Sequence, residues 1–90
     1  MTPQLSPPEQ VAIVLGLVSV YAGRQLHDNT DSRRLGFAEV GISSLALASV
    51  IVELEDRLGR EFDFEAFAGV ETVADLLRAV GLPSADGASQ

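Results

Sequence analysis

Two adjacent serines, Ser43 and Ser44, stand directly before an apolar run in this chain of 90 residues. Every residue from Leu45 to Val52 is apolar or small, and the first charge arrives at Glu53. A hydroxyl at the start of a helix has two common uses. It caps the first turn by accepting a backbone N–H, or it carries a phosphate, which the unpaired N–H groups and the helix dipole favour. Spacing alone favours capping, with Ser43 as the N-cap residue.

The other side chains offer little for catalysis or metal binding. There is no cysteine and one histidine, His27, which excludes disulfides, thiol catalysis and a zinc cluster. A serine nucleophile needs a base and an oxyanion hole. The GISSL sequence lacks the second glycine of a nucleophile elbow, and His27 falls in an expected loop. Since there is no glycine-rich phosphate loop either, we expect no catalytic residue, no metal site and no bound nucleotide.

The acidic charge is confined to one part of the chain. Thirteen Asp and Glu residues face six arginines and no lysine, and the net charge is −7. Residues 1–35 are balanced, so residues 36–90 hold the entire excess. This distribution argues against nucleic acid or an anionic membrane as a partner. It favours basic proteins, although acidic residues also keep a small domain soluble.

The longest apolar run, Val11 to Ala22, is shorter than the roughly 20 residues that a membrane span needs. No positive residue precedes the run, as a signal peptide would require. We therefore expect a cytoplasmic protein.

Helices are expected to position the serines. Ser6 and Glu9 have the spacing of a capping box, which predicts a helix from there to about Ala22, stopped by Gly23. The polar segment 23–34 indicates a long loop. Three apolar side chains are expected to hold this segment to the core: Leu26, Leu35 and Phe37.

The serines then begin a second helix, from about Ser44 to Leu58, which Gly59 ends. The segment 60–70 is too short for a long helix. It is expected to form a loop with one short helical turn near residues 65–68.

A last helix follows. Thr72 and Asp75 have capping-box spacing, and Gly81 provides the stop. The chain is therefore predicted to be all-α, a small four-helix bundle with three main helices and one short helix. We expect three parts: a flexible N-terminus at residues 1–7, the folded domain at 8–81, and a disordered tail at 82–90.

The second helix has two apolar sides. One stripe is predicted to face the core: Leu47, Val50, Ile51, Leu54 and Leu58. Leu45, Ala48 and Val52 lie about 100–160° away on a helical wheel, beside a polar rim. An exposed apolar strip of this kind predicts a docking surface, unless segment 23–40 covers it.

The first helix also carries a second apolar stripe, made by Ile13, Leu17 and Val20. This stripe either supports self-association or is buried by the long loop. We expect a monomer, with weak self-association as the alternative.

The residues around the serines resemble a known signature. The stretch Phe37-Ala-Glu-Val-Gly-Ile-Ser43-Ser44-Leu45 is similar to F-x-x-L-G-x-D-S-L of acyl and peptidyl carrier proteins. The resemblance continues through LEDRLG, FDFEAF and ETVADLL and covers about residues 8–80. It implies a carrier rather than an enzyme. A separate phosphopantetheinyl transferase would esterify Ser44 with 4′-phosphopantetheine from coenzyme A, and the thiol of this arm would hold an acyl or aminoacyl group as a thioester.

The resemblance also implies partners and a docking surface. Besides the transferase, the partners would be the enzymes that load and process the acyl or aminoacyl group. The matching docking positions are Leu45, Ala48, Val52, Glu53, Asp56 and Val70. A further set matches positions that line the bundle interior: Phe62, Phe67, Val70, Val73 and Leu77. These side chains either shelter an acyl chain or fill the core, and the core interpretation is favoured.

The sequence departs from the family in the first turns of the second helix. Ser43 stands where Asp is usual, and Ala46 and Ser49 stand at positions that are usually acidic. We therefore hypothesise that partners recognise the apolar strip more than its charges, and that their binding depends weakly on salt. Ser43 is the alternative attachment residue, disfavoured because Leu45 follows Ser44 in the motif.

The neutral front of this helix favours bacterial specialised metabolism, such as polyketide or nonribosomal peptide (antibiotic) biosynthesis, over housekeeping fatty-acid synthesis. The Ala-, Val- and Gly-rich, Lys-free composition favours a GC-rich bacterial source. A chain of 90 residues without a flanking catalytic domain predicts a discrete carrier, with an acyl load slightly favoured over an aminoacyl load. The alternative is an unmodified, carrier-like module for protein–protein interaction or dimerisation.

Overall fold

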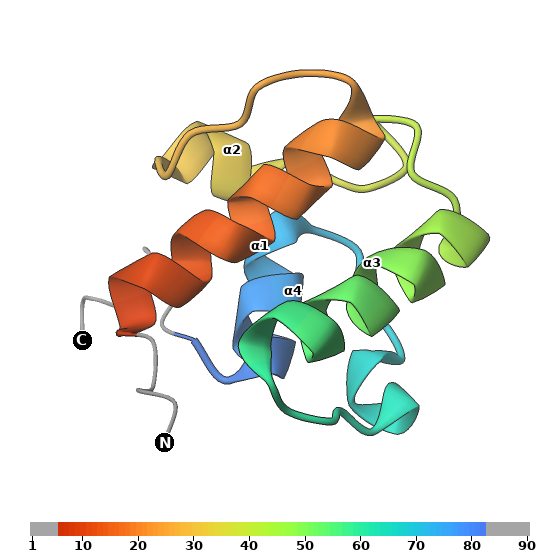
Figure 1. The fold of residues 1–90 in the computed structure, drawn as a ribbon. Coiled ribbons are helices and arrows are strands. Elements are labelled where there is room, and N and C mark those ends of the chain that lie inside the picture. The colour runs from red at the N-terminus through yellow and green to blue at the C-terminus, as the bar shows by residue number, and fades with distance from the viewer. Residues whose placement is uncertain (1–5, 83–90) are drawn as a thin grey trace.

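The computed structural model describes residues 6–82, in which all regular elements are helical (Figure 1). In chain order they are α1 (Pro7–Ala22), α2 (Thr30–Arg34), α3 (Ser44–Leu58), the 3-10 helix η1 (Phe64–Phe67) and α4 (Val73–Val80). The predicted all-α bundle with three main helices is confirmed, as is the short turn before the last helix.

The ends of α1 follow from its capping residues. The Ser6 hydroxyl accepts the Glu9 backbone N–H, and the Glu9 side chain accepts the Ser6 N–H at 2.8 Å, which completes the predicted capping box. Gly23 ends the helix in the left-handed conformation, with φ of 71°. The predicted bounds of this helix are confirmed.

The structure corrects the prediction that residues 23–34 are a loop, because α2 occupies the end of this segment. The Asn29 side chain caps α2 by accepting the Ser32 N–H at 2.8 Å. Arg33 is buried and pairs with Asp28 at 2.7 Å. Asp, Asn, Thr and Ser favour loops and helix N-caps alike, so the composition that indicated a loop also fits this short helix.

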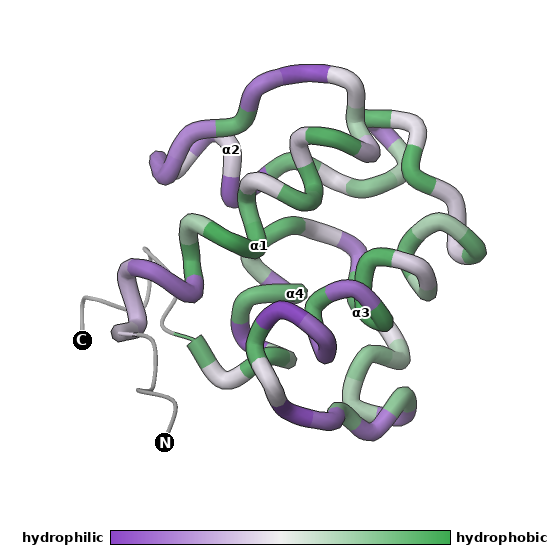
Figure 2. The backbone as a smooth tube through the Cα atoms, viewed as in Figure 1, coloured by the Kyte–Doolittle hydropathy of each residue, from purple (hydrophilic) through white to green (hydrophobic). Residues whose placement is uncertain are grey.

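The core is an apolar cluster shared by α1, α3 and α4. Its fully buried members include Val14, Val18, Val50, Leu54, Leu76 and Leu77. α1 packs against α3, and α2 packs against α4. Figure 2 shows the hydrophilic stretches at the periphery, in the segments that lead into α2 and into η1. Of the three residues predicted to anchor segment 23–37, Leu26 and Phe37 are buried and Leu35 is half-buried.

The folded part extends slightly beyond the predicted 8–81. Pro7 belongs to α1, and Leu82 is only 6% exposed in the core. The other residues assigned to the two ends, except the capping Ser6, lie outside the described range. None of the helices in residues 6–82 has the length and apolar character needed to cross a membrane.

A backbone connection places the loop before α3 beside the start of α4. The Phe37 N–H donates to the Glu71 carbonyl at 2.8 Å, and the Val73 N–H donates to the Leu35 carbonyl at 3.0 Å. Between them, Gly36 and Thr72 form an isolated antiparallel bridge. The Gly36 N–H donates to the Glu39 carboxylate at 2.7 Å, and a Cβ at Gly36 would lie 3.2 Å from the same carboxylate, so the absence of a side chain leaves room for this hydrogen bond.

Candidate functional site

The two serines have different surroundings. Ser43 is the N-cap of α3, and its hydroxyl accepts the Ala46 backbone N–H at 3.1 Å. Ser44 is the first residue of the helix and is exposed. Within residues 6–82 its hydroxyl makes no hydrogen bond. The Ser43 oxygen is therefore engaged in holding the helix, whereas the Ser44 oxygen is open to solvent.

Two hollows meet at Ser44. One, here named the Arg34 groove, has a volume of about 420 Å³ and lies between segments 34–39 and 70–72. The other, the Phe64 groove, has a volume of about 310 Å³ and lies between α3 and η1. Ser44, Leu47 and Val70 line both hollows. A group attached to the Ser44 oxygen thus has two places to lie against the protein.

The apolar strip of α3 is open, as the docking interpretation requires. Leu45 is 80% exposed and Val52 is 53% exposed, while Ala48 is half-buried. Segment 23–40 therefore does not cover the strip. Val70 is half-buried beside the same end of α3.

Phe64 extends this surface and was missed by the sequence analysis. It is 55% exposed and lines the Phe64 groove together with Ala48. Its neighbour Phe67 is buried. The segment is too short for any periodicity to separate the exposed phenylalanine from the buried one, so the sequence held no signal for this residue.

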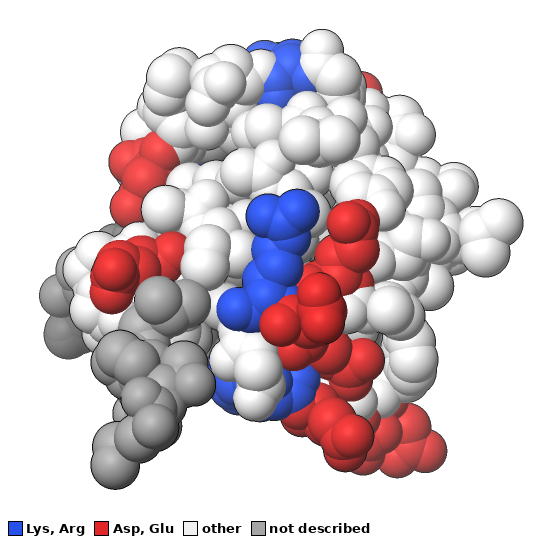
Figure 3. All heavy atoms as spheres, in the orientation of Figure 1, with Lys and Arg blue, Asp and Glu red and all other residues white. Residues whose placement is uncertain are grey.

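The two acidic docking candidates, Asp56 and Glu53, differ in their exposure and in their hydrogen bonding. Asp56 is exposed on α3. Glu53 is half-buried and accepts a hydrogen bond from the Tyr21 hydroxyl at 2.5 Å, which links α1 to α3 and raises the pKa of Tyr21. In Figure 3, acidic side chains gather over the C-terminal half of α3 and the segment toward η1, whereas the N-terminal half of α3 shows no charge. The acidic charge of α3 itself thus lies at the end of the helix opposite Ser44.

The side chains matched to the bundle interior are packed into the core. Phe67, Val73 and Leu77 are buried, and Phe62 and Val70 are half-buried. Phe62 lies edge-on to Phe67, with ring centroids 5.6 Å apart. This packing agrees with the interpretation that these residues fill the interior.

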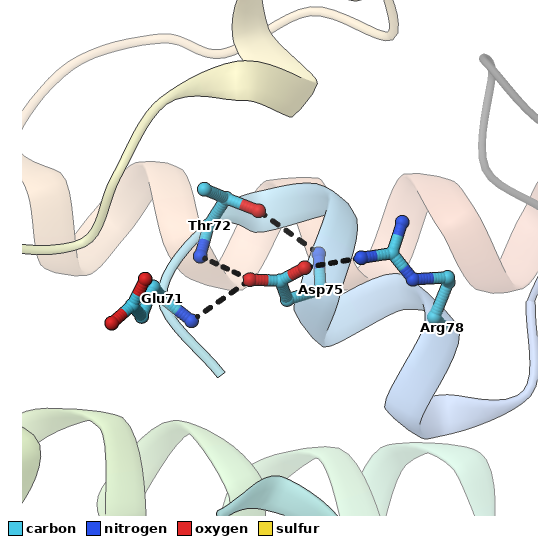
Figure 4. A network of polar contacts seen from close by, with 4 residues as sticks. All are labelled: Glu71, Thr72, Asp75 and Arg78. Atoms are coloured by element: carbon cyan, nitrogen blue, oxygen red, sulfur yellow. Dashed lines mark hydrogen bonds and ion pairs between the residues drawn. The ribbon is translucent and has the colours of Figure 1, made fainter. Parts of the chain in front are cut away.

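A polar network at the start of α4 holds one wall of the Arg34 groove (Figure 4). The Asp75 carboxylate accepts the backbone N–H groups of Glu71 at 3.1 Å and Thr72 at 3.2 Å, and also pairs with Arg78. The Thr72 hydroxyl accepts the Asp75 N–H at 3.1 Å and completes the predicted capping box. These contacts, with the Glu71 N–H bond as the largest cause, lower the pKa of Asp75.

Around Ser44, the described residues present an exposed hydroxyl at a helix N-terminus. No three His, Cys, Asp or Glu side chains gather as metal ligands anywhere in residues 6–82. His27 is exposed in the segment before α2, which does not line either hollow at Ser44. An exposed, unbonded hydroxyl at a helix N-terminus fits a covalently held phosphate, because the end of the helix dipole favours the anion.

Comparison with protein-family models matches residues 12–80 to the family described as phosphopantetheine attachment site. The chain belongs to this family. Its domain is a carrier and not a catalyst, and it carries a covalently attached 4′-phosphopantetheine. The resemblance to acyl and peptidyl carrier proteins is therefore confirmed, together with the cofactor. The chain matches no curated protein and no solved structure.

Proposed function

We propose that this carrier bears its phosphopantetheine on Ser44 and presents a thioester-bound acyl group to partner enzymes. The observation that carries the proposal is the contrast between the two serines. The Ser43 hydroxyl is used by the helix cap, whereas the Ser44 hydroxyl is exposed and makes no hydrogen bond within residues 6–82. Modification of Ser44 therefore leaves the cap of α3 intact.

In this proposal, the chain itself provides only the serine oxygen that is modified, and a separate enzyme catalyses the modification. A phosphopantetheinyl transferase would join the Ser44 oxygen to the phosphorus of the phosphopantetheinyl group of coenzyme A, with loss of the serine proton and of the adenosine bisphosphate. The arm supplies the thiol that forms the thioester. The chain itself supplies a defined attachment point at the N-terminus of α3 and a surface that partners can grip.

We assign that surface to the open strip of α3 and its neighbours. Leu45 and Val52 provide exposed apolar area, and Asp56 provides an exposed charge. Ala48 and Val70 lie beside Ser44, while Glu53 is a weaker candidate because its carboxylate is bonded to Tyr21. The partners in this proposal are the transferase and the enzymes that load and process the acyl group, in the cytoplasm.

The neutral front of α3 supports a role in specialised metabolism of the polyketide type. Acidic side chains are absent from the first turns of the helix and begin at Glu53. On the first turns of α3, a partner therefore meets apolar and hydroxyl groups. We also propose an acyl load in preference to an aminoacyl one, which the uncharged lining of the Phe64 groove beside Ser44 supports.

The test is the mass of the protein after exposure to a transferase. The wild-type chain, coexpressed with a broad-specificity phosphopantetheinyl transferase, is expected to gain one phosphopantetheinyl group in intact mass spectrometry. The Ser44→Ala variant is expected to gain none. If no transferase modifies the wild type, the chain acts instead as an unmodified, carrier-like interaction module. A gain of mass by Ser44→Ala would move the attachment to another residue.

A further inference from the structure

The Arg34 groove combines groups of three kinds beside Ser44. Arg34 supplies a positive charge, and Glu39 and Glu71 supply carboxylates. Its remaining lining is more apolar than polar and includes Phe37 and Ile42. Arg34 is exposed and forms no ion pair within residues 6–82, so its guanidinium is available to another anion.

The Phe64 groove differs in chemistry although it also reaches Ser44. No charged side chain lines it, and Phe64, Phe67 and Ile51 make up much of its wall. An apolar acyl group fits such a surface. The arm itself has another composition, because phosphopantetheine carries a phosphodiester, a branched apolar segment and two amide groups. Of the two grooves, only the Arg34 groove offers all three complements. It has a cation for the phosphodiester, apolar surface for the branched segment and hydrogen-bond acceptors for the amide groups.

The charge of the molecule makes the position of Arg34 informative. The net charge is −7, which disfavours a phosphate held near the surface. Around Ser44, however, positions 43, 46 and 49 are uncharged and an arginine lies in the adjoining groove. Arginine binds phosphate oxygens through a planar set of donors. Arg34 is therefore the positive group that this groove offers to a phosphodiester on Ser44; the other charged side chains in its lining are Glu71 and Glu39, and the Glu39 carboxylate accepts the Gly36 N–H.

We propose that the Arg34 groove is a resting site for the phosphopantetheine arm, with Arg34 binding its phosphodiester. The proposal rests on the proposed function, since it needs the arm on Ser44. In this state the arm lies between segments 34–39 and 70–72 when no partner is bound. The Phe64 groove then remains free for the acyl group or a partner side chain.

The experiment compares the apo and phosphopantetheinylated forms by residue-resolved amide NMR. Intact mass first establishes that Ser44 is loaded, which tests the proposed function separately. Loading is then expected to shift the amide signals of residues 36–39 and 70–72. Two results would overturn the resting site while leaving the carrier function standing. One is shifts confined to residues 43–46, and the other is shifts at residues 64–69 instead of at 36–39 and 70–72. Failure to load would remove both.

Arg34→Gln tests the role of the guanidinium, with Arg57→Gln as the matched control. Both variants lose one exposed positive charge, but Arg57 lies 13 residues after Ser44 on α3, roughly 20 Å along the helix. Arg34→Gln is expected to reduce the seated fraction of the arm about two- to fivefold, as the loss of one exposed ion pair would. Arg57→Gln is expected to change nothing. Equal behaviour of the two loaded variants would overturn the assignment to Arg34.

Salt provides an independent readout on the same samples. Added salt should weaken the groove shifts in the loaded wild type, because it screens an exposed arginine–phosphate pair. In Arg34→Gln the remaining shifts should be insensitive to salt. An identical salt response in both proteins would contradict the proposed contact.

Discussion

Ser43 and Ser44 adjoin each other in the chain but hold their hydroxyl groups in different environments. One hydroxyl accepts the Ala46 N–H and the other projects into solvent. Loss of the first should therefore affect folding, and loss of the second should affect modification. The two effects can be measured separately.

We expect Ser43→Ala to lower the free energy of unfolding by about 1 kcal/mol, because α3 loses its N-cap side chain. The same variant should still gain one phosphopantetheinyl group. Urea denaturation and intact mass provide the two measurements, with Ser44→Ala as the control that keeps the cap. A Ser43→Ala variant that unfolds normally but cannot be loaded would reverse the roles of the serines.

Ser43→Asp restores the residue that the carrier signature usually has at this position. Aspartate caps helices about as well as serine, so stability should be nearly unchanged. We expect a generic transferase to load this variant several-fold faster than the wild type, because the family's usual contact is present. Initial rates of loading at equal protein concentration check this expectation. Equal or lower rates would mean that Ser43 is not what limits recognition.

At the scale of single residues, the sequence predicted the exposure of the α3 strip. The carrier register singled out Ser44, and the helical wheel placed Leu45 and Val52 outside the core, where they are found. It did not predict Phe64 as exposed or Glu53 as bonded to Tyr21. Both depend on how separate segments pack, which local spacing does not determine.

The exposed strip of α3 is the feature by which partners should recognise this carrier. We expect Leu45→Ala to lower the kcat/KM of the transferase about tenfold, since a contact of this size loses on the order of 1–2 kcal/mol. Stability should be unaffected because Leu45 is exposed. Val20→Ala on α1 is a suitable control, since Val20 is 76% exposed and remote in sequence. Equal losses for the two variants would contradict docking through the strip.

The charge pattern of α3 leads to a second expectation for partner binding. The acidic residues of α3 lie in its C-terminal half (Figure 3), so partner affinity should fall only slightly between low and moderate ionic strength. Calorimetry over a series of salt concentrations provides the measurement. A steep loss of affinity would show that salt bridges dominate docking.

The start of α4 should respond to acid. The pKa of Asp75 is lowered because the carboxylate accepts backbone N–H groups. The stabilisation of the folded state by the ionised Asp75 carboxylate is therefore fully present above the ordinary pKa near 4 and is lost as pH falls through the lowered pKa. We expect Asp75→Asn to be less stable than wild type by about 1 kcal/mol at pH 7. Urea unfolding at pH 7 and at pH 2 should show this difference shrinking, and a constant difference would contradict the assignment.

The helices whose ends carry strong signals were predicted well. Capping boxes and left-handed glycines mark both ends of α1 and α4. α2 has no such marks, because its capping residue Asn29 lies in a run of polar residues. Its Arg33 is buried and pairs with Asp28, and burial of an arginine from a polar segment is contrary to the usual expectation.

For the molecule as a whole, the open question in the sequence was the second apolar stripe of α1. Leu17 is buried, Ile13 is half-buried and only Val20 is well exposed. One isolated apolar side chain does not make an interface. We expect sedimentation velocity to show a monomer over a wide range of concentrations. Concentration-dependent growth that Val20→Asp abolishes would instead favour dimerisation through α1.

The bridge between Gly36 and Thr72 has a consequence for how a carrier delivers its load. It joins the loop before α3 to the start of α4, so on the proposed function the arm would leave from a base held on two sides. The space that a tethered thioester can search is then determined by the length of the tether rather than by motion of its base. The effective concentration of the load at a docked active site follows from that length. Loosening this bridge should therefore slow delivery to every enzyme alike, without changing how tightly each one binds.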